Sequence, residues 1–188
     1  MESIVLPNSV TTIGESPFKD CKALKELIFP EGIKSIEECK FDGCTNLEKV
    51  VFPSNTISVN CVSFINCTNL KSVTLPDGLN EIVDGAFRNC SALVEVNMSE
   101  TITSIGEWAF TDCKVLKEVT IPSNVYRIDK YAFGYSGVKT IRCKPTTPPS
   151  LGEWVFDSRK ITLYVPYNCK SDYEGSDWSK YIDKIIEM

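Results

Sequence analysis

Cysteine is the residue type whose spacing in this chain most clearly invites a chemical role, because a thiolate can bind a metal, form a disulfide or act as a nucleophile. The chain has 188 residues, of which 9 are cysteines. Five of them recur at steps of 23 residues: Cys21, Cys44, Cys67, Cys90 and Cys113. Such a column has two interpretations, a metal-binding or redox-active array and a stack of small buried side chains.

The spacing favours the buried stack. Zinc needs a tetrahedral set of ligands, commonly with pairs close in sequence, and a linear column does not supply it. Disulfides between successive members would strain a parallel stack, whereas cysteine is among the most often buried residues. We therefore predict buried thiols, no metal site and no cofactor. The odd count leaves a thiol unpaired within a monomer, and the sequence allows one disulfide, of unspecified pairing, among Cys39, Cys61, Cys143 and Cys169.

Histidine is absent from the chain. Its absence excludes Ser–His and Cys–His nucleophile pairs and every His-ligated metal site. The sequence also lacks the glycine-rich phosphate loops and the Gly-x-Ser-x-Gly nucleophile motif. Its carboxylates are scattered over repeat positions rather than paired across a cleft, as a glycosidase requires. We therefore predict that the protein is not an enzyme.

The charge balance also narrows the range of partners. Twenty basic residues against 25 acidic ones give a net charge of −5, and no cluster of Lys and Arg stands out. Nucleic-acid-binding proteins carry a basic stripe, so we expect no nucleic-acid partner. The apolar runs are only a few residues long, too short to cross a bilayer, and we expect no membrane insertion.

The residues around the cysteine column recur with the same step of 23. Phenylalanine stands three residues before each cysteine and continues one step further, at Phe18, Phe41, Phe64, Phe87, Phe110 and Phe133. Leucine stands three residues after each cysteine, at Leu24, Leu47, Leu70, Leu93 and Leu116. Three further columns are apolar; they begin at Leu6, Ile13 and Leu27. Periods of 20–29 residues with this leucine pattern mark leucine-rich repeats.

Stacking explains the pattern, since one coil cannot bury its apolar side chains without neighbours above and below. The alternation over residues 116–121 predicts a half-buried strand that Pro122 ends, and residues 102–105 predict a second extended stretch. We predict a mainly β repeat solenoid over residues 1–144, a right-handed leucine-rich-repeat coil of about six turns of 23 residues.

The last part of the chain departs from the repeat, as terminal repeats must. The coil after Phe133 slips by one residue, and a proline-rich stretch follows. We predict that residues 145–188 form an atypical C-terminal cap of the same domain. It contains a degenerate repeat at Phe156, a strand over 161–166, short helical turns over 168–181 and a strand over 184–187. At the other end residues 4–7 end a coil whose first half is missing, which predicts further coils upstream or end-to-end self-association.

The unit Ile-Thr-Ser-Ile-Gly-Glu-Trp-Ala-Phe-Thr-Asp-Cys, followed by Leu116 and Ile121-Pro122, resembles the BspA-like leucine-rich repeat over residues 4–143. The segment Leu163-Tyr164-Val165-Pro166 resembles the tail of such proteins from Bacteroides-type gut bacteria. Relatives of this kind are surface or secreted proteins of bacteria and mucosal protozoa, linked to adhesion to host matrix and cells. The resemblance therefore implies a cell-surface or secreted location, although the N-terminal residues contain no signal peptide. It carries over no active-site residues.

Solenoids bind along their long faces, so the outward positions of the main strand are the candidate binding residues. One column reads Ile28, Val51, Thr74, Asn97, Thr120 and then Arg142, and its neighbour reads Glu26, Lys49, Ser72, Glu95, Glu118 and then Thr140. We predict a protein-binding or adhesion surface there, with a host matrix or cell-surface protein as the partner. The alternative is a solvated sheet with cross-strand pairs such as Lys49 opposite Glu26.

Two other functions remain open. The repeat is also compatible with a structural spacer in a larger surface protein. Aromatic residues crowd the C-terminal half, at Trp108, Tyr126, Tyr131, Tyr135, Trp154, Tyr164, Tyr167, Tyr173, Trp178 and Tyr181. They form either a platform for stacking sugars, in a carbohydrate-binding module, or the packing of the cap.

Overall fold

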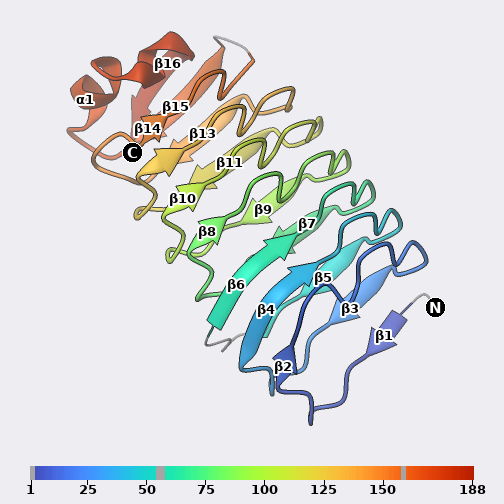
Figure 1. Ribbon diagram of the computed structural model, residues 1–188. Coiled ribbons are helices and arrows are strands. Elements are labelled where there is room, and N and C mark those ends of the chain that lie inside the picture. The colour runs from blue at the N-terminus through green and yellow to red at the C-terminus, as the bar shows by residue number, and fades with distance from the viewer. Residues whose placement is uncertain (1–2, 54–57, 158–159) are drawn as a thin grey trace.

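The computed structural model describes residues 3–53, 58–157 and 160–188, and Figure 1 shows them as a stack of coils that ends in two short helical segments. The side chains of residues 36–39 and 58–62 lie outside the described part, so the predictions for Cys39 and Cys61 fall there. Within the described residues no helix is long and apolar enough to cross a membrane.

One side of every coil is a strand of the main sheet, and all pairings are parallel. The first five strands pair in the order β1, β3, β5, β7, β9; their bounds are Ser3–Val5, Glu26–Ile28, Lys49–Val51, Ser72–Thr74 and Glu95–Asn97. A second ladder continues this side with β11, β13, β15 and β16; their bounds are Glu118–Ile121, Thr140–Cys143, Ile161–Val165 and Ile182–Glu187. Each pairing joins residues one coil apart, which is how a solenoid forms its sheet.

A second set of short strands lies on another side of each coil, as the extended stretch over 102–105 predicted. One ladder contains β2, β4 and β6; their bounds are Thr12–Ile13, Ser35–Lys40 and Ser58–Ser63. The other contains β8, β10, β12 and β14; their bounds are Glu81–Ile82, Ser104–Ile105, Arg127–Ile128 and Ser150–Leu151. We refer to the two ladders together as the second sheet.

The phenylalanine column forms the spine of the core. Successive rings stack nearly parallel, with centroids 5.0–5.5 Å apart and planes 2–17° from each other. This offset stacking is a favoured arrangement for aromatic pairs. The stack begins at Phe18 and continues past Phe133 to Phe156. The degenerate repeat at Phe156 therefore adds a seventh turn to the predicted six.

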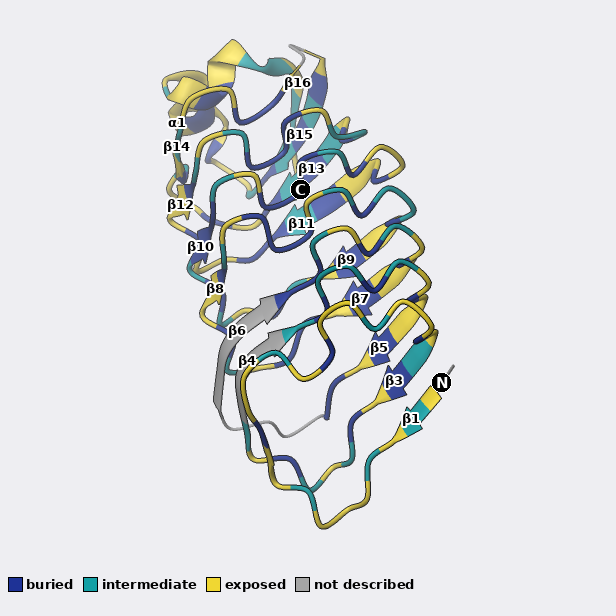
Figure 2. Ribbon diagram, turned by 45° about the vertical axis from the view of Figure 1, so that its right-hand side comes forward, coloured by how far each residue is buried: buried dark blue, intermediate teal, exposed yellow. Residues whose placement is uncertain are grey.

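The cysteine and leucine columns line the same core. Cys44, Cys67, Cys90 and Cys113 are fully buried, and Cys21 in the first coil is half-buried. The leucine column from Leu24 to Leu116 is buried throughout. Figure 2 shows this interior in dark blue and the exposed residues on the outside of the coils. The predicted stack of buried thiols is confirmed for these coils.

A left-handed backbone recurs two residues after the core phenylalanine, from Phe18 to Phe133, and it also occurs two residues before the phenylalanine at Ser16, Gly85, Trp108, Tyr131 and Trp154. The position after it holds residues that tolerate this conformation, among them Asp20, Asn66 and Asn89 with φ of 56–62° and Gly43 with φ of 76°. Around Phe110 the two positions are Trp108 and Asp112. The coils from Phe18 to Phe133 therefore all bend two residues after the phenylalanine, and most of the described coils also bend two residues before it.

The predicted slip shortens the coils by one residue. Glu118 pairs with Thr140, and Thr140 pairs with Thr162, steps of 22 residues in place of 23. The missing residue brings the backbone at Gly137 close to the preceding coil, where a Cβ would lie 2.3 Å from the Lys114 carbonyl oxygen. Only glycine fits such an approach without movement.

The cap elements agree with the sequence prediction, while the division of the chain at residue 144 stays a prediction. The strand β15, the helix α1 (Lys170–Glu174), the 3₁₀ turn over Asp177–Lys180 and the strand β16 follow in the predicted order. Tyr173 and Trp178 are buried in the cap. The Tyr173 hydroxyl donates to the Pro145 carbonyl oxygen at 2.7 Å, and the Trp178 indole donates to the Pro149 carbonyl oxygen at 2.9 Å. The cap is thus tied to the proline-rich stretch.

Candidate functional site

The ten predicted binding residues lie on the outer face of the main sheet. In β3 the inward Leu27 is fully buried, while Glu26 and Ile28 on either side of it point outward. Parallel pairing places Glu26 opposite Lys49 and Ile28 opposite Val51. The same relation repeats in β7 and β9, where Ser72 lies opposite Glu95 and Thr74 opposite Asn97.

The two ladders divide the predicted columns. Glu118 and Thr120 lie in β11, which pairs with β13 and not with β9. The structure therefore brings the first eight candidates together in one ladder and the last two together in the next. We call the two columns jointly the outer strand face.

One of the two columns is apolar in the N-terminal part of the outer strand face. Val5, Ile28 and Val51 stand in register on β1, β3 and β5, and their exposed fractions are 89%, 52% and 36%. Val5 belongs to the same column at the 23-residue step, one coil before Ile28, where the predicted column began. Contiguous exposed apolar side chains on a soluble protein mark sites of contact with other molecules.

The C-terminal part of the outer strand face is polar and charged. The Arg142 guanidinium donates to the Glu118 carboxylate at 2.6 Å and lies over the Tyr164 ring, 4.5 Å from its centroid. Near the other end Lys49 and Glu26 form the expected cross-strand ion pair at 2.9 Å. Both ion pairs are largely exposed, so each contributes little to stability and remains free to exchange partners.

Three hollows of about 400–430 Å³ lie along this side. One lies beside β1 and β3 and is lined by Val5 and Ile28; a second, beside β5 and β7, is lined by Val51 and Thr74. The third, beside β9, β11 and β13, includes Asn97, Thr120 and Arg142. No cluster of metal-binding side chains occurs among the described residues.

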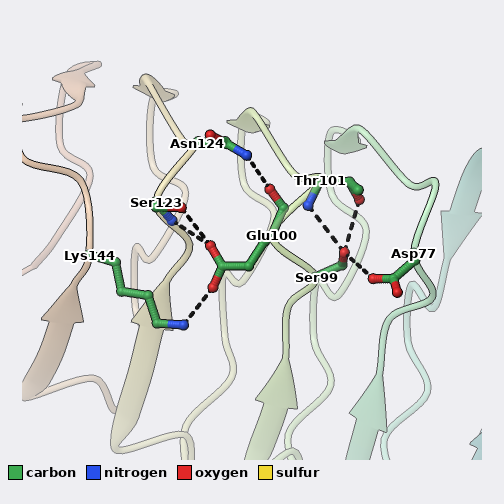
Figure 3. Close-up of polar contacts among 7 residues, drawn as sticks. All are labelled: Asp77, Ser99, Glu100, Thr101, Ser123, Asn124 and Lys144. Atoms are coloured by element: carbon green, nitrogen blue, oxygen red, sulfur yellow. Dashed lines mark hydrogen bonds and ion pairs between the residues drawn. The ribbon is translucent and has the colours of Figure 1, made fainter.

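A polar network follows the strand ends of the same side (Figure 3). Ser99 stands where most coils carry proline, and its hydroxyl donates to Asp77 at 2.6 Å while accepting from the Thr101 backbone N–H at 3.1 Å. The Glu100 carboxylate accepts from the Ser123 backbone and hydroxyl at 2.9 and 2.7 Å and pairs with Lys144 at 2.5 Å. These contacts, that of Lys144 above all, lower the pKa of Glu100 to about 2.

The buried thiols are poor candidates for chemistry. Burial raises the pKa of Cys44 to about 11 and that of Cys113 to about 12, so both stay protonated at neutral pH. Cys143 and Cys169 are free thiols as well. A disulfide that involves either of these two is therefore absent, and that part of the sequence hypothesis is wrong. Cys143 is instead a buried thiol whose sulfur lies within hydrogen-bond distance of the Tyr173 hydroxyl oxygen, at 3.2 Å.

Comparison with known proteins agrees with this geometry. A family described as the BspA type leucine rich repeat region, in six copies, matches residues 1–114 and 34–162. The chain belongs to the BspA-type leucine-rich-repeat family. The sequence-based resemblance to that family is thus confirmed. No curated protein matches this BspA-type chain.

Solved structures share the fold of this BspA-type chain. A leucine-rich repeat protein from Bacteroides ovatus ATCC 8483 is 24% identical with a TM-score of 0.66, and the match covers 100% of this chain and 54% of that one. One from Eubacterium ventriosum ATCC 27560 is 26% identical with a TM-score of 0.65, over 74% and 38%. The T. pallidum leucine rich repeat protein is 19% identical with a TM-score of 0.51, over 94% and 83%. The chain spans about half, or less, of the first two.

Proposed function

We propose that this BspA-type solenoid is a non-catalytic protein-binding module, and that its outer strand face contacts the partner. The observation that carries the proposal is the register of Val5, Ile28 and Val51, which gathers exposed apolar side chains from three coils. Apolar side chains at the centre of a protein contact supply most of the binding energy, with polar residues around them. Thr74 and Asn97 continue the outer strand face and supply polar residues beside the apolar ones.

The class of partner and the location belong to the same proposal. Family membership is consistent with an interaction module built from repeats. We propose that the chain acts at the cell surface or after secretion, and that it binds an extracellular-matrix or cell-surface protein of a host. The net charge of −5 favours partners with a neutral or basic contact surface.

The test is a binding screen of the purified chain against immobilised extracellular-matrix proteins. The double variant Ile28→Lys/Val51→Lys places two charges in the apolar part, and we expect it to weaken binding by at least about tenfold. The variant Lys49→Glu/Glu95→Lys leaves the net charge unchanged, and we expect it to alter the association rate more than the lifetime of the complex.

The matched control is Val94→Lys/Val115→Lys. Both valines are exposed, at 61% and 41%, and they lie outside the outer strand face. If the control lowers binding as much as the Ile28/Val51 variant does, the contact lies elsewhere. If no matrix protein binds the unaltered chain, the spacer function becomes the better account.

A further inference from the structure

The structure separates the aromatic residues of the C-terminal half into two groups. Tyr173 and Trp178 are buried and pack the cap, as one interpretation of the sequence expected. Trp108 and Trp154 are exposed, at 41% and 63%, and Tyr131 is partly exposed. These three follow one another at steps of 23 residues, each three residues after a strand of the second sheet. We call them the aromatic row.

The aromatic row is built into the hydrogen-bonded frame of the coils. The Trp108 backbone N–H donates to the Lys130 carbonyl oxygen at 3.1 Å, and the Tyr131 N–H donates to the Glu153 carbonyl oxygen at 3.0 Å. Neighbouring members therefore stand one coil apart, and the two tryptophans stand about 10 Å apart, twice the spacing between paired strands.

The backbone at these positions is costly for large side chains. Trp108, Tyr131 and Trp154 all have positive φ, at 56°, 55° and 54°. Bulky residues are genuine outliers in this region, and the equivalent position of an earlier coil holds Gly85 with φ of 67°. Large aromatic residues at three successive positions of this kind are strained, whereas glycine adopts this conformation freely. Strain of this kind points to a role in binding.

Cations hold two of the rings in place. The Arg88 guanidinium lies 5.9 Å from the Trp108 ring centroid, and the Lys130 ammonium lies 5.4 Å from the Tyr131 ring centroid. Such contacts stabilise an aromatic ring on a protein surface. The rings are thus oriented before a ligand arrives, which lowers the entropic cost of binding.

The row ends in a hollow of about 530 Å³, which lies between the last coil and the cap. Trp154 and Tyr181 supply aromatic walls, and Glu153, Asp157 and Asp177 supply carboxylates. Small-molecule sites have this composition, apolar walls with a few polar groups that fix orientation. Partial burial raises the pKa of Asp157.

The charges around the row exclude ionic ligands. Acidic groups at Glu153, Asp157 and Asp177 repel an anionic chain, while Lys130 and Lys180 are engaged with Glu153 at 3.8 Å and Asp177 at 2.5 Å. A cationic ligand would meet the positive charges of Arg88 and Lys130 beside the row. A neutral ligand with hydroxyl groups avoids both conflicts, because carboxylates accept hydrogen bonds from hydroxyls.

We propose that the aromatic row and the hollow beside Trp154 bind a neutral linear oligosaccharide. The C–H faces of successive sugar rings pack on the electron-rich faces of Trp108, Tyr131 and Trp154. The hydroxyls of the sugar at the end of the chain are held by the carboxylates of the hollow. This site follows the second sheet, so it is separate from the outer strand face and does not depend on it.

The test is isothermal titration of the full chain with neutral linear hexasaccharides, namely β-1,4-glucan, β-1,4-mannan, β-1,3-glucan and α-1,4-glucan. A hexamer of galacturonic acid serves as the anionic counterpart. We expect at least one neutral hexamer to bind with a Kd below about 1 mM, and the acidic hexamer not to bind. Failure of all neutral hexamers, or preference for the acidic one, overturns the proposal.

Two glycine variants distinguish binding from folding. Trp108→Gly and Trp154→Gly remove a ring and relieve the positive φ, so we expect the Tm to stay equal or rise while binding weakens by at least about tenfold. Trp154→Tyr keeps a ring and should retain binding. The controls Tyr126→Ala and Tyr167→Ala remove exposed aromatics outside the row, and unchanged binding is expected. The proposal is contradicted if both glycine variants bind as well as the unaltered chain. It is also contradicted if Trp154→Tyr loses as much binding as Trp154→Gly does.

Discussion

The thiol of Cys90 donates a hydrogen bond to the backbone carbonyl oxygen of Phe64 at 3.0 Å, across 26 residues of sequence. The same bond joins Cys44 to Phe18, at 2.8 Å, and recurs in two further coils. The Phe64 carbonyl oxygen also accepts from the Cys67 backbone N–H at 3.0 Å. A side chain in this column must therefore be small, apolar and a donor, and cysteine combines the three.

This relationship predicts the effect of removing one thiol. Cys90→Ala deletes a buried donor and leaves a small void, and we expect it to lower the free energy of unfolding by about 1–2 kcal/mol. Cys21→Ala, in the half-buried first position, should cost less. Urea denaturation of both variants measures the difference. A Cys90→Ala protein as stable as the unaltered one would show that the thiol bond contributes nothing.

The raised thiol pKa values predict a loss of stability at high pH. Burial shifts the pKa of Cys44 from 9.0 to about 11 and that of Cys113 to about 12. A group whose pKa is raised in the folded state stabilises fully below its unfolded pKa, and the effect is lost as the pH rises through the folded value. We therefore expect the Tm to fall between about pH 9 and pH 12.

Thiol labelling checks the same assignment residue by residue. At pH 8 a thiol reagent should modify Cys21 much faster than Cys44 or Cys113, because only the thiolate reacts and only Cys21 is partly open to solvent. Peptide mapping by mass spectrometry after timed quenching resolves the sites. Equal rates at the three cysteines in the native protein would contradict a buried column.

The repeat made most of this fold predictable from sequence, because every coil must satisfy the same packing condition. Phe110 could be placed in the core from its spacing alone, and the outward direction of Lys49 followed from strand alternation. The aromatic row could not be recognised in the same way. Trp108 and Trp154 have positive φ, a backbone conformation that tryptophan rarely adopts. Only the folded structure therefore shows that these two are exposed while Trp178 is buried.

The polar network at the strand ends also could not be predicted from the sequence. Lys144 lies 44 residues after Glu100, two coils further on, and the slip displaces it from the regular 23-residue spacing. The slip after Phe133 shortens two coils and changes which side chains meet, so the register had to be observed. Irregular coils are thus where sequence spacing loses its predictive value.

Glu100 predicts an acid-dependent contribution to stability. Its pKa falls from 4.5 to about 2, first through Lys144 and then through Ser123. A lowered folded-state pKa stabilises above the unfolded value, and this is lost as the pH falls from about 4.5 to about 2. The carboxylate is about half exposed, so solvent screening limits the expected effect of Glu100→Gln to about 1 kcal/mol at pH 6.

Chemical denaturation at pH 6 and pH 2.5 tests this assignment. The difference between the unaltered protein and Glu100→Gln should shrink towards zero at the lower pH. Glu174→Gln serves as the control, since Glu174 is exposed and its carboxylate lies 3.7 Å from Lys170. A cost of Glu100→Gln that persists unchanged at pH 2.5 would mean that it arises from packing rather than from charge.

The slipped coil predicts a site where one methyl group is costly. A Cβ at Gly137 would lie 2.3 Å from the Lys114 carbonyl oxygen and 2.9 Å from its carbonyl carbon, and both are backbone atoms that cannot rotate away. Gly137→Ala must therefore push two coils apart, and we expect it to destabilise the protein by about 1–3 kcal/mol, as overpacking does.

Gly14→Ala is the matched control, because a Cβ there meets nothing within 4 Å. Alanine at that position restricts only the unfolded chain and should stabilise by about 0.4–1 kcal/mol. Opposite signs in thermal unfolding of the two variants would locate the cost in the shortened coil, whereas a neutral Gly137→Ala would show that the coils can separate freely there.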